Sequence, residues 1–127
     1  MAIKVKRTVF PAELADAVAA HATALVAGDD GGAAKFVNDR AAAAFGAAIK
    51  RGASMRPFKG YEVIARARLG FQYIVKVRVH GAAGDLTLQN RWHEEGNGDW
   101  RIVEVEDLGL QSPWKKPEQG AAVNVNG

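Results

Sequence analysis

The stretch YEVIARARLGFQYIVKVRVHGAAGDLTLQNRWHEEGNGDWRIVEVEDL (61–108) decides the fold. Apolar and polar residues alternate along it with a period of two, which is typical of strands that bury one face. Gly70 and the turn clusters GAAGD (81–85) and EGNGD (95–99) divide it into four runs. Such short turns join antiparallel neighbours, and the Asn97-Gly98 pair is a strong hairpin signal. The stretch therefore predicts a four-stranded antiparallel sheet, which the glycines at the strand ends allow to curve.

One parity of these strands is apolar and predicts the buried face of the sheet. The last run breaks this pattern, because Ile102 and Val103 are adjacent and both apolar. A regular strand would point Glu104 toward the buried face. A bulge near Val103 would shift the register by one residue and point Asp107 there instead.

The other parity carries eight basic side chains: Arg66, Arg68, Lys76, Arg78, His80, Arg91, His93 and Arg101. It also carries the apolar residues Ile64, Ile74, Val103 and Val105. These apolar residues suit a subunit interface better than a solvated phosphate-binding surface. The net charge of +3 is also small for a protein that binds nucleic acid through phosphate contacts. We therefore expect a homodimer through this face and no nucleic-acid binding.

The residues before the sheet are rich in alanine and predict helices. We expect a helix from Pro11 to Gly28, a short helix capped by Asp29 or Asp30 and running through Val37, and a helix over about 40–51. Helices followed by an antiparallel sheet predict an α+β fold with the helices on one sheet face. We assign 1–110 to one domain, in which 3–9 can add an edge strand, and 111–127 to a flexible tail.

Composition excludes several classes of protein. Hydrophobic residues are 48% and charged residues 24% of the chain, which is typical of a soluble globular domain. There is no cysteine, and the three histidines lack the spacing of metal ligands, so we expect no metal site and no cofactor. No apolar run approaches membrane-spanning length, and MAIKVKR (1–7) is not followed by the apolar segment of a signal peptide. These observations predict no membrane association and a cytoplasmic location.

Two segments, ALVAGDDGGAAKFV (24–37) and GNGDWRIVEVED (96–107), together with the order of elements, resemble the nuclear transport factor 2-like superfamily. That group includes SnoaL-like and ketosteroid isomerase-like proteins and is described as a cystatin-like α+β fold. The resemblance implies a cone with helices on the concave face of a curved sheet, an apolar pocket, and a homodimer through the outer sheet face. It implies either a non-catalytic binding domain or an isomerase, dehydratase or cyclase. The segment NDRAAAAFGAAIKRG (38–52) is a plain helix where isomerase-like members usually carry an acid.

Polar exceptions on the apolar faces define the candidate pocket. His21 lies on the stripe of Leu14, Val18 and Leu25, so its ring should point at the sheet. There it could act as a general base, or it could be a buried histidine bonded to a neighbour. The expected lining residues are His21, Phe45, Tyr61, Tyr73, Asn90, Trp92 and Glu104. We predict a domain that binds a small apolar ligand in this pocket; the alternative is an enzyme that uses general acid–base catalysis there.

Overall fold

The structure is a computed structural model in which residues 10–110 are described. Three α-helices come first and are followed by a single-turn 3-10 helix: α1 (Ala12–Ala27), α2 (Asp30–Ala34), α3 (Ala42–Gly52) and η1 (Ala53–Met55). Four strands and a last 3-10 turn complete the fold: β1 (Phe58–Leu69), β2 (Gln72–Gly81), β3 (Gly84–Glu94), β4 (Trp100–Asp107) and η2 (Leu108–Leu110). The expected edge strand over 3–9 and the expected tail over 111–127 lie outside the described residues.

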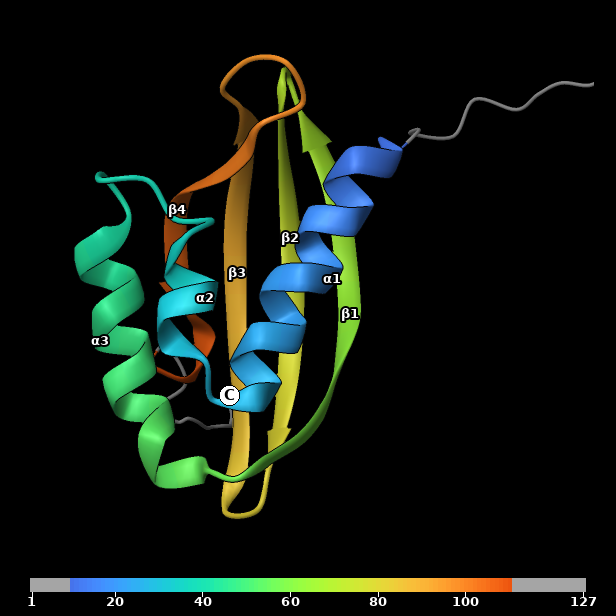
Figure 1. The fold of residues 1–127 in the computed structure, drawn as a ribbon. Coiled ribbons are helices and arrows are strands. Elements are labelled where there is room, and N and C mark those ends of the chain that lie inside the picture. The colour runs from blue at the N-terminus through green and yellow to red at the C-terminus, as the bar shows by residue number, and fades with distance from the viewer. Residues whose placement is uncertain (1–9, 111–127) are drawn as a thin grey trace, which may run out of the picture.

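The strands form one sheet in the order β1-β2-β3-β4, and each pair of neighbours is antiparallel. Figure 1 shows the helices on one side of the sheet, with α1 crossing β1 and β2 and α3 lying alongside β4. We call the sheet face toward α1 the inner face and the opposite face the outer face. The α+β class, the antiparallel sheet and the packing of the helices against it are confirmed.

Local signals set the ends of α1 and the start of α2. Gly28 ends α1 with a φ of 75°, a left-handed conformation that favours glycine. Asp29 then caps α2, because its carboxylate accepts a hydrogen bond from the Gly32 N–H at 2.9 Å. Both features were expected from the sequence.

The second helix is shorter than predicted, because the chain after it joins the edge of β4. Val37 forms a parallel bridge with Ile102. The Ile102 N–H donates to the Phe36 carbonyl at 2.6 Å, and the Asn38 N–H donates to the Ile102 carbonyl at 3.0 Å. Covering an exposed strand edge in this way satisfies backbone groups that a longer helix would leave unpaired.

The core lies between α1 and the inner face. The alternation predicted for β2 and β3 is confirmed, since every second residue of both strands is buried. The buried residues of these strands are Tyr73, Val75, Val77, Val79, Leu86, Leu88, Asn90 and Trp92. Leu14, Val18 and Leu25 of α1 are at most 5% exposed and pack against them. This packing fixes the helix that carries His21 over the middle of the sheet.

The predicted faces of β1 are wrong in its second half. The register shifts between Val63 and Ala65, so Ile64 is an extra residue in the ladder. Beyond it, Arg66 pairs with Val75 and Arg68 with Tyr73, and both arginines therefore belong to the inner face. They remain exposed there because β1 is an edge strand, and their long stems reach past the core to water.

In β4 the structure decides between the two registers that the sequence left open. Trp92 pairs with Ile102 and Arg91 with Glu104, so Val103 is the extra residue of a bulge. Val105 is consequently buried on the inner face, whereas Glu104 lies on the outer face. The bulged alternative is confirmed.

Candidate functional site

An aromatic cluster surrounds His21 in the interior. The centroid of the His21 ring lies 5.9 Å from that of Phe36, 5.7 Å from that of Phe45 and 5.8 Å from that of Trp92. The side chains come from α1, the segment after α2, α3 and β3, so four parts of the chain meet there. His21 is 2% exposed. The prediction that it points at the sheet is confirmed.

Burial determines the charge of His21. Desolvation disfavours the imidazolium and lowers the pKa of His21 to about 4, so the ring is neutral near pH 7. A base with so low a pKa accepts a proton poorly at neutral pH. Its Nε2 atom is buried and has no hydrogen-bond partner among the described residues. The ring can therefore offer a hydrogen bond to a neutral group.

Asn90 and Trp92 place two more polar atoms in the same interior. They lie two residues apart on β3 and share its inner face. Asn90 Oδ1 and Trp92 Nε1 are buried and lack partners among the described residues. A buried polar group without a partner costs about 1–3 kcal/mol, and native proteins rarely leave several together. We call His21, Asn90 and Trp92 the interior polar set.

The other predicted lining residues divide into two groups. Phe45 joins the cluster directly, and Tyr73 lies beside Trp92 as its cross-strand neighbour. Tyr61 pairs instead with Val79 and packs against the far end of the core. The structure thus brings His21, Phe45 and Trp92 into one cluster and buries Asn90 two residues from Trp92 on β3. The ring of Tyr73 contacts Phe10 and Trp100 instead, and Tyr61 lies apart.

The prediction that Glu104 lines the pocket is wrong, because it requires a regular β4 and the strand is bulged. Its side chain is 62% exposed, and its Oε1 accepts a hydrogen bond from Arg91 Nε at 2.8 Å on the outer face. Asp107 does face inward, but both of its oxygens accept from Arg51 at 2.6 Å. That hydrogen bonding raises the pKa of Arg51. Among residues 10–110, no carboxylate is paired with His21.

The sequence missed the Arg51–Asp107 pair and the inward turn of Arg68. Arg51 lies in the last turn of α3, and Asp107 is the last residue of β4. Because Val103 is an extra residue in β4, Asp107 points to the side of the sheet on which α3 lies. The available signal was a pair of adjacent apolar branched residues. Val63–Ile64 marks the bulge in β1 just as Ile102–Val103 marks the one in β4.

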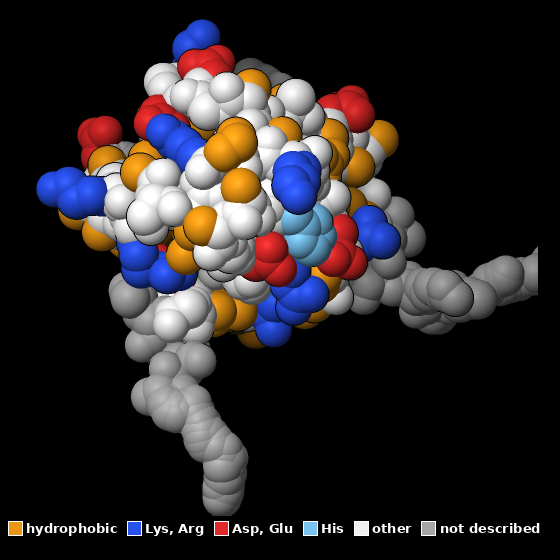
Figure 2. Space-filling model, turned by 90° about the horizontal axis from the view of Figure 1, so that it is seen from below, with side chains coloured by type: hydrophobic (Ala, Val, Ile, Leu, Met, Phe, Trp, Pro, Cys, Tyr) orange, Lys and Arg blue, Asp and Glu red, His pale blue; other side chains and the backbone are white. Residues whose placement is uncertain are grey.

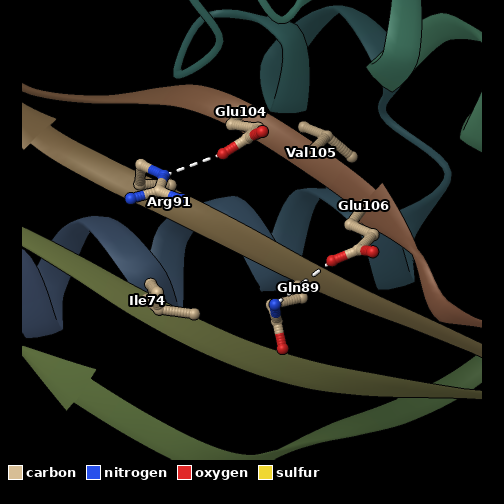
Figure 3. Close-up of a pocket in the computed structure, with 6 residues that line it drawn as sticks. All are labelled: Ile74, Gln89, Arg91, Glu104, Val105 and Glu106. Carbon is tan, nitrogen blue, oxygen red and sulfur yellow. Dashed lines mark hydrogen bonds and ion pairs between the residues drawn. The ribbon is translucent and has the colours of Figure 1, made fainter. Parts of the chain in front are cut away.

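The outer face is open, since the described helices all lie on the other side of the sheet. It carries a hollow of about 240 Å³, lined by Ile74, Gln89, Arg91, Glu104, Val105 and Glu106. Figure 3 shows how these six side chains lie. Two cross-strand contacts span this hollow: Arg91 with Glu104, and Gln89 Nε2 donating to Glu106 Oε1 at 3.2 Å. An adjoining hollow of about 540 Å³ reaches from there to Arg40 and Ala44 near the start of α3.

Charges of both signs meet at the end of the molecule that carries the β2–β3 turn. His80 Nε2 lies 3.1 Å from Glu62 Oε1, and His80 Nδ1 lies 3.3 Å from Asp85 Oδ1. Figure 2 views this end and shows acidic and basic side chains interspersed with apolar ones. Nothing in this region resembles a patch of a single charge.

Comparison with known proteins yields no match: no family model, no curated protein and no solved structure is significantly similar to this chain. Among the described residues, no helix has the length and apolar character needed to cross a membrane. The same residues contain no group of three or more histidine, aspartate or glutamate side chains that could hold a metal ion.

Proposed function

We propose that this chain is a nuclear transport factor 2-like binding domain that holds a small, flat, largely apolar molecule at the interior polar set. The observation that supports this is the unpartnered state of His21 Nε2, Asn90 Oδ1 and Trp92 Nε1 inside an otherwise apolar, aromatic environment. Ligand sites typically combine an apolar lining with a few polar groups that fix orientation. A hydroxyl or carbonyl on the ligand would give these atoms the partners that the described residues do not provide.

The neutral state of His21 favours a neutral ligand. Burial lowers the pKa of His21 to about 4, and no described carboxylate or cation forms an ion pair with it. A charged ligand group would therefore lose its hydration without gaining an opposite charge. The same facts argue for binding rather than acid–base catalysis, because a neutral imidazole with so low a pKa is a weak base near pH 7, and it has no acidic partner among residues 10–110.

We further propose that two copies of the domain pair through their outer faces. On this face, Ile74 and Val103 are only half-exposed, and the strands differ in charge. Lys76 and Arg78 lie on β2, whereas Glu104 and Glu106 lie on β4. A two-fold axis parallel to the strands would place β4 of one copy over β1 of the other, next to its β2. The glutamates of β4 would then lie near the basic side chains of β2 in the other copy.

The ligand proposal is tested with 2-naphthol and with naphthalene, which has the same rings but no hydroxyl. Binding is followed by NMR through the imidazole signals of His21 and the indole N–H signal of Trp92. We expect 2-naphthol to shift both sets of signals and to bind at least ~10-fold more tightly than naphthalene, a preference of about 1.4 kcal/mol from one good hydrogen bond.

Two variants on one strand separate a specific site from general apolar binding. Asn90→Leu removes an interior polar atom and should reduce the preference for 2-naphthol to about 3-fold or less. Gln89→Leu changes the adjacent residue, which faces outward, and should leave the preference intact. Failure of 2-naphthol at about 1 mM to shift either reporter would contradict the proposal, since that concentration detects even weak binding.

A further inference from the structure

A second pocket lies at the end of the sheet where the β1–β2 and β3–β4 turns meet the start of α1. Its volume is about 380 Å³, and its lining includes Pro11, Arg68, Phe71, Tyr73, His93 and Trp100. We call it the end pocket. It is separate from the interior polar set, because His21, Asn90 and Trp92 do not line it.

Two residues that line the end pocket carry buried polar atoms without a partner among the described residues. Trp100 is 7% exposed, and its Nε1 atom has no hydrogen-bond partner among the described residues. The same holds for the buried Nδ1 atom of His93. An indole N–H can only donate, so the group that would satisfy Trp100 must be an acceptor.

The walls of the end pocket are aromatic. The rings of Tyr73 and Trp100 meet edge-to-face with centroids 5.7 Å apart. Phe71 stands beside them and is 85% exposed, the largest exposure among the exposed large hydrophobic residues. The hairpin itself does not need an aromatic residue there. Gly70 supplies the positive φ of 63° that the two-residue turn requires, and the position after it tolerates polar residues. An exposed ring beside an aromatic hollow is what a flat aromatic ligand would pack against.

Arg68 gives the end pocket a cationic group that can pair with an anion. Arg68 Nε donates to the Gly70 carbonyl at 2.9 Å, which fixes the guanidinium beside Phe71 and leaves its terminal nitrogens outside that bond. The acid at the pocket, Glu94, accepts a hydrogen bond from the Gly98 N–H at 2.7 Å and is thereby tied to the β3–β4 turn. A carboxylate on a ligand could thus pair with Arg68 and accept from Trp100.

We propose that the end pocket binds a small aromatic carboxylate. Its ring packs against Phe71 and the Tyr73–Trp100 pair, while its carboxylate accepts hydrogen bonds from Trp100 Nε1–H and Arg68. A proline-rich peptide fits less well, because such peptides need an extended groove lined by successive aromatic ridges rather than one compact hollow.

The test uses benzoate as the probe and records the indole N–H signals of the 15N-labelled full chain. The chain has three tryptophans, and the Trp100 signal is assigned from its loss in Trp100→Phe. Titration to about 10 mM covers affinities down to the millimolar range. Benzoate should move the Trp100 signal and leave that of Trp92 in place. Benzyl alcohol, with the ring but no charge, and acetate, with the charge but no ring, should each bind at least ~10-fold more weakly.

A matched pair of arginine variants tests the assigned residue. Arg68→Gln should weaken benzoate binding about 10-fold, as expected for loss of one charge-assisted contact. Arg66→Gln removes an arginine two residues away on the same face, one that lies over Phe10 and does not line the pocket, and should change affinity less than about 2-fold. Phe71→Ser should also weaken binding, and its amide spectrum should stay that of the folded protein because the ring is exposed.

Three results would overturn the proposal. The first is a Trp100 signal that does not respond to benzoate. The second is equal binding of benzoate and benzyl alcohol. The third is a proline-rich decapeptide that moves the Trp100 signal when benzoate does not. None of them affects the interior polar set, which 2-naphthol reports through His21 and Trp92.

Discussion

Individual residues in this fold carry polar groups into places that rarely accept them. His21 and Asn90 are 2% and 1% exposed, yet each has a polar atom without a hydrogen-bond partner in the described part of the chain. The energetic consequence differs between them, because His21 can change its charge and Asn90 cannot. Burial of His21 lowers its pKa, so the free-energy cost of burying this side chain can be measured as a pH dependence of stability.

Stability should fall below pH 6.5 because of His21. In the unfolded chain this imidazole takes up a proton near its ordinary pKa of 6.5, whereas burial lowers the pKa of His21 in the folded protein to about 4. Between these values the unfolded state binds more protons, so the free energy of unfolding decreases as the pH falls, by on the order of 3 kcal/mol in total. Above pH 6.5 this contribution is constant. Urea unfolding at pH 4.5, 5.5 and 7 measures it.

Two substitutions assign the effect to His21. His21→Leu should remove this part of the pH dependence, because no titratable group remains at the site. His80→Gln replaces an exposed histidine between Glu62 and Asp85, and should preserve the decline. An unchanged profile in His21→Leu would mean that another group is responsible.

The Arg51–Asp107 pair should contribute more than a surface ion pair. Both contacts measure 2.6 Å, and the Asp107 side chain is 6% exposed. Arg51→Ala leaves the carboxylate buried with only the Gly109 N–H as a donor, at a cost of about 2–4 kcal/mol. Arg51→Lys should recover little of it, because an ammonium cannot form the two parallel bonds. A double-mutant cycle with Asp107→Asn measures the coupling; a value below about 0.5 kcal/mol would place the pair with ordinary surface pairs.

At the scale of the element, Ile64 in β1 and Val103 in β4 are extra residues that stand outside the alternation of the faces. Trp92 pairs with Ile102, and Arg91 pairs with Glu104. If Val103 were removed, these two pairs would be consecutive and the ladder would be regular. Val103 therefore adds local twist and length without altering the faces on either side. Deletion of a residue in the regular part of β4 beyond the bulge would reverse the faces that follow it.

Deletion of Val103 should consequently be tolerated. We expect it to cost about 1–2 kcal/mol, mainly from lost apolar contact. Deletion of Glu106 should cost at least ~3 kcal/mol, because it turns Asp107 to the outer face and breaks its bonds with Arg51. Chemical denaturation of the two deletion variants compares them directly. Equal costs would show that the bulge is needed for the fold.

The elements that sequence could predict are those whose alternation is strict. In β2 and β3, valines and leucines alternate with charged or amide residues, so their faces were predicted correctly. In β1 the pattern misled, because Ala65 and Ala67 are small and Arg66 and Arg68 polar, which suggests an inward alanine face. The Ile64 bulge reverses this. The arginines tolerate the inner face only because an edge strand leaves their ends in water.

The candidate site was predictable to the same extent. The helical stripe placed His21 against the sheet, and strict alternation placed Asn90 and Trp92 inward. The ring of Phe36 could not be anticipated, since that segment was expected to be helical. Its position depends on the bridge between Val37 and Ile102, which is a long-range contact. The end pocket depends on two turns and the start of a helix, which local patterns do not bring together.

At the scale of the whole molecule, one sheet face is covered by helices and the other is not. Strand spacing of about 4.8 Å and a rise of about 3.3 Å per residue give an outer face on the order of 600 Å². That is somewhat below the roughly 800 Å² per partner of a standard stable interface. A homodimer through this face should therefore dissociate in the micromolar range rather than the nanomolar range, and concentration should determine whether it forms.

Sedimentation velocity over about 1–200 μM should show this monomer–dimer equilibrium, and higher salt should weaken the dimer, because salt screens the charges that pair between the two copies.

Ile74→Glu places a charge in the centre of the face, between Ala67 and Arg91, and should leave a monomer throughout this range. Phe71→Ser also removes an exposed apolar side chain, but at the hairpin tip rather than on the face, and should dimerise normally. Lys76→Glu should weaken the dimer about 10-fold, and adding Glu106→Lys should restore part of the loss by reversing both charges. If Phe71→Ser abolishes the dimer while Ile74→Glu does not, the two copies meet through the end pocket, and the sheet face is not the interface.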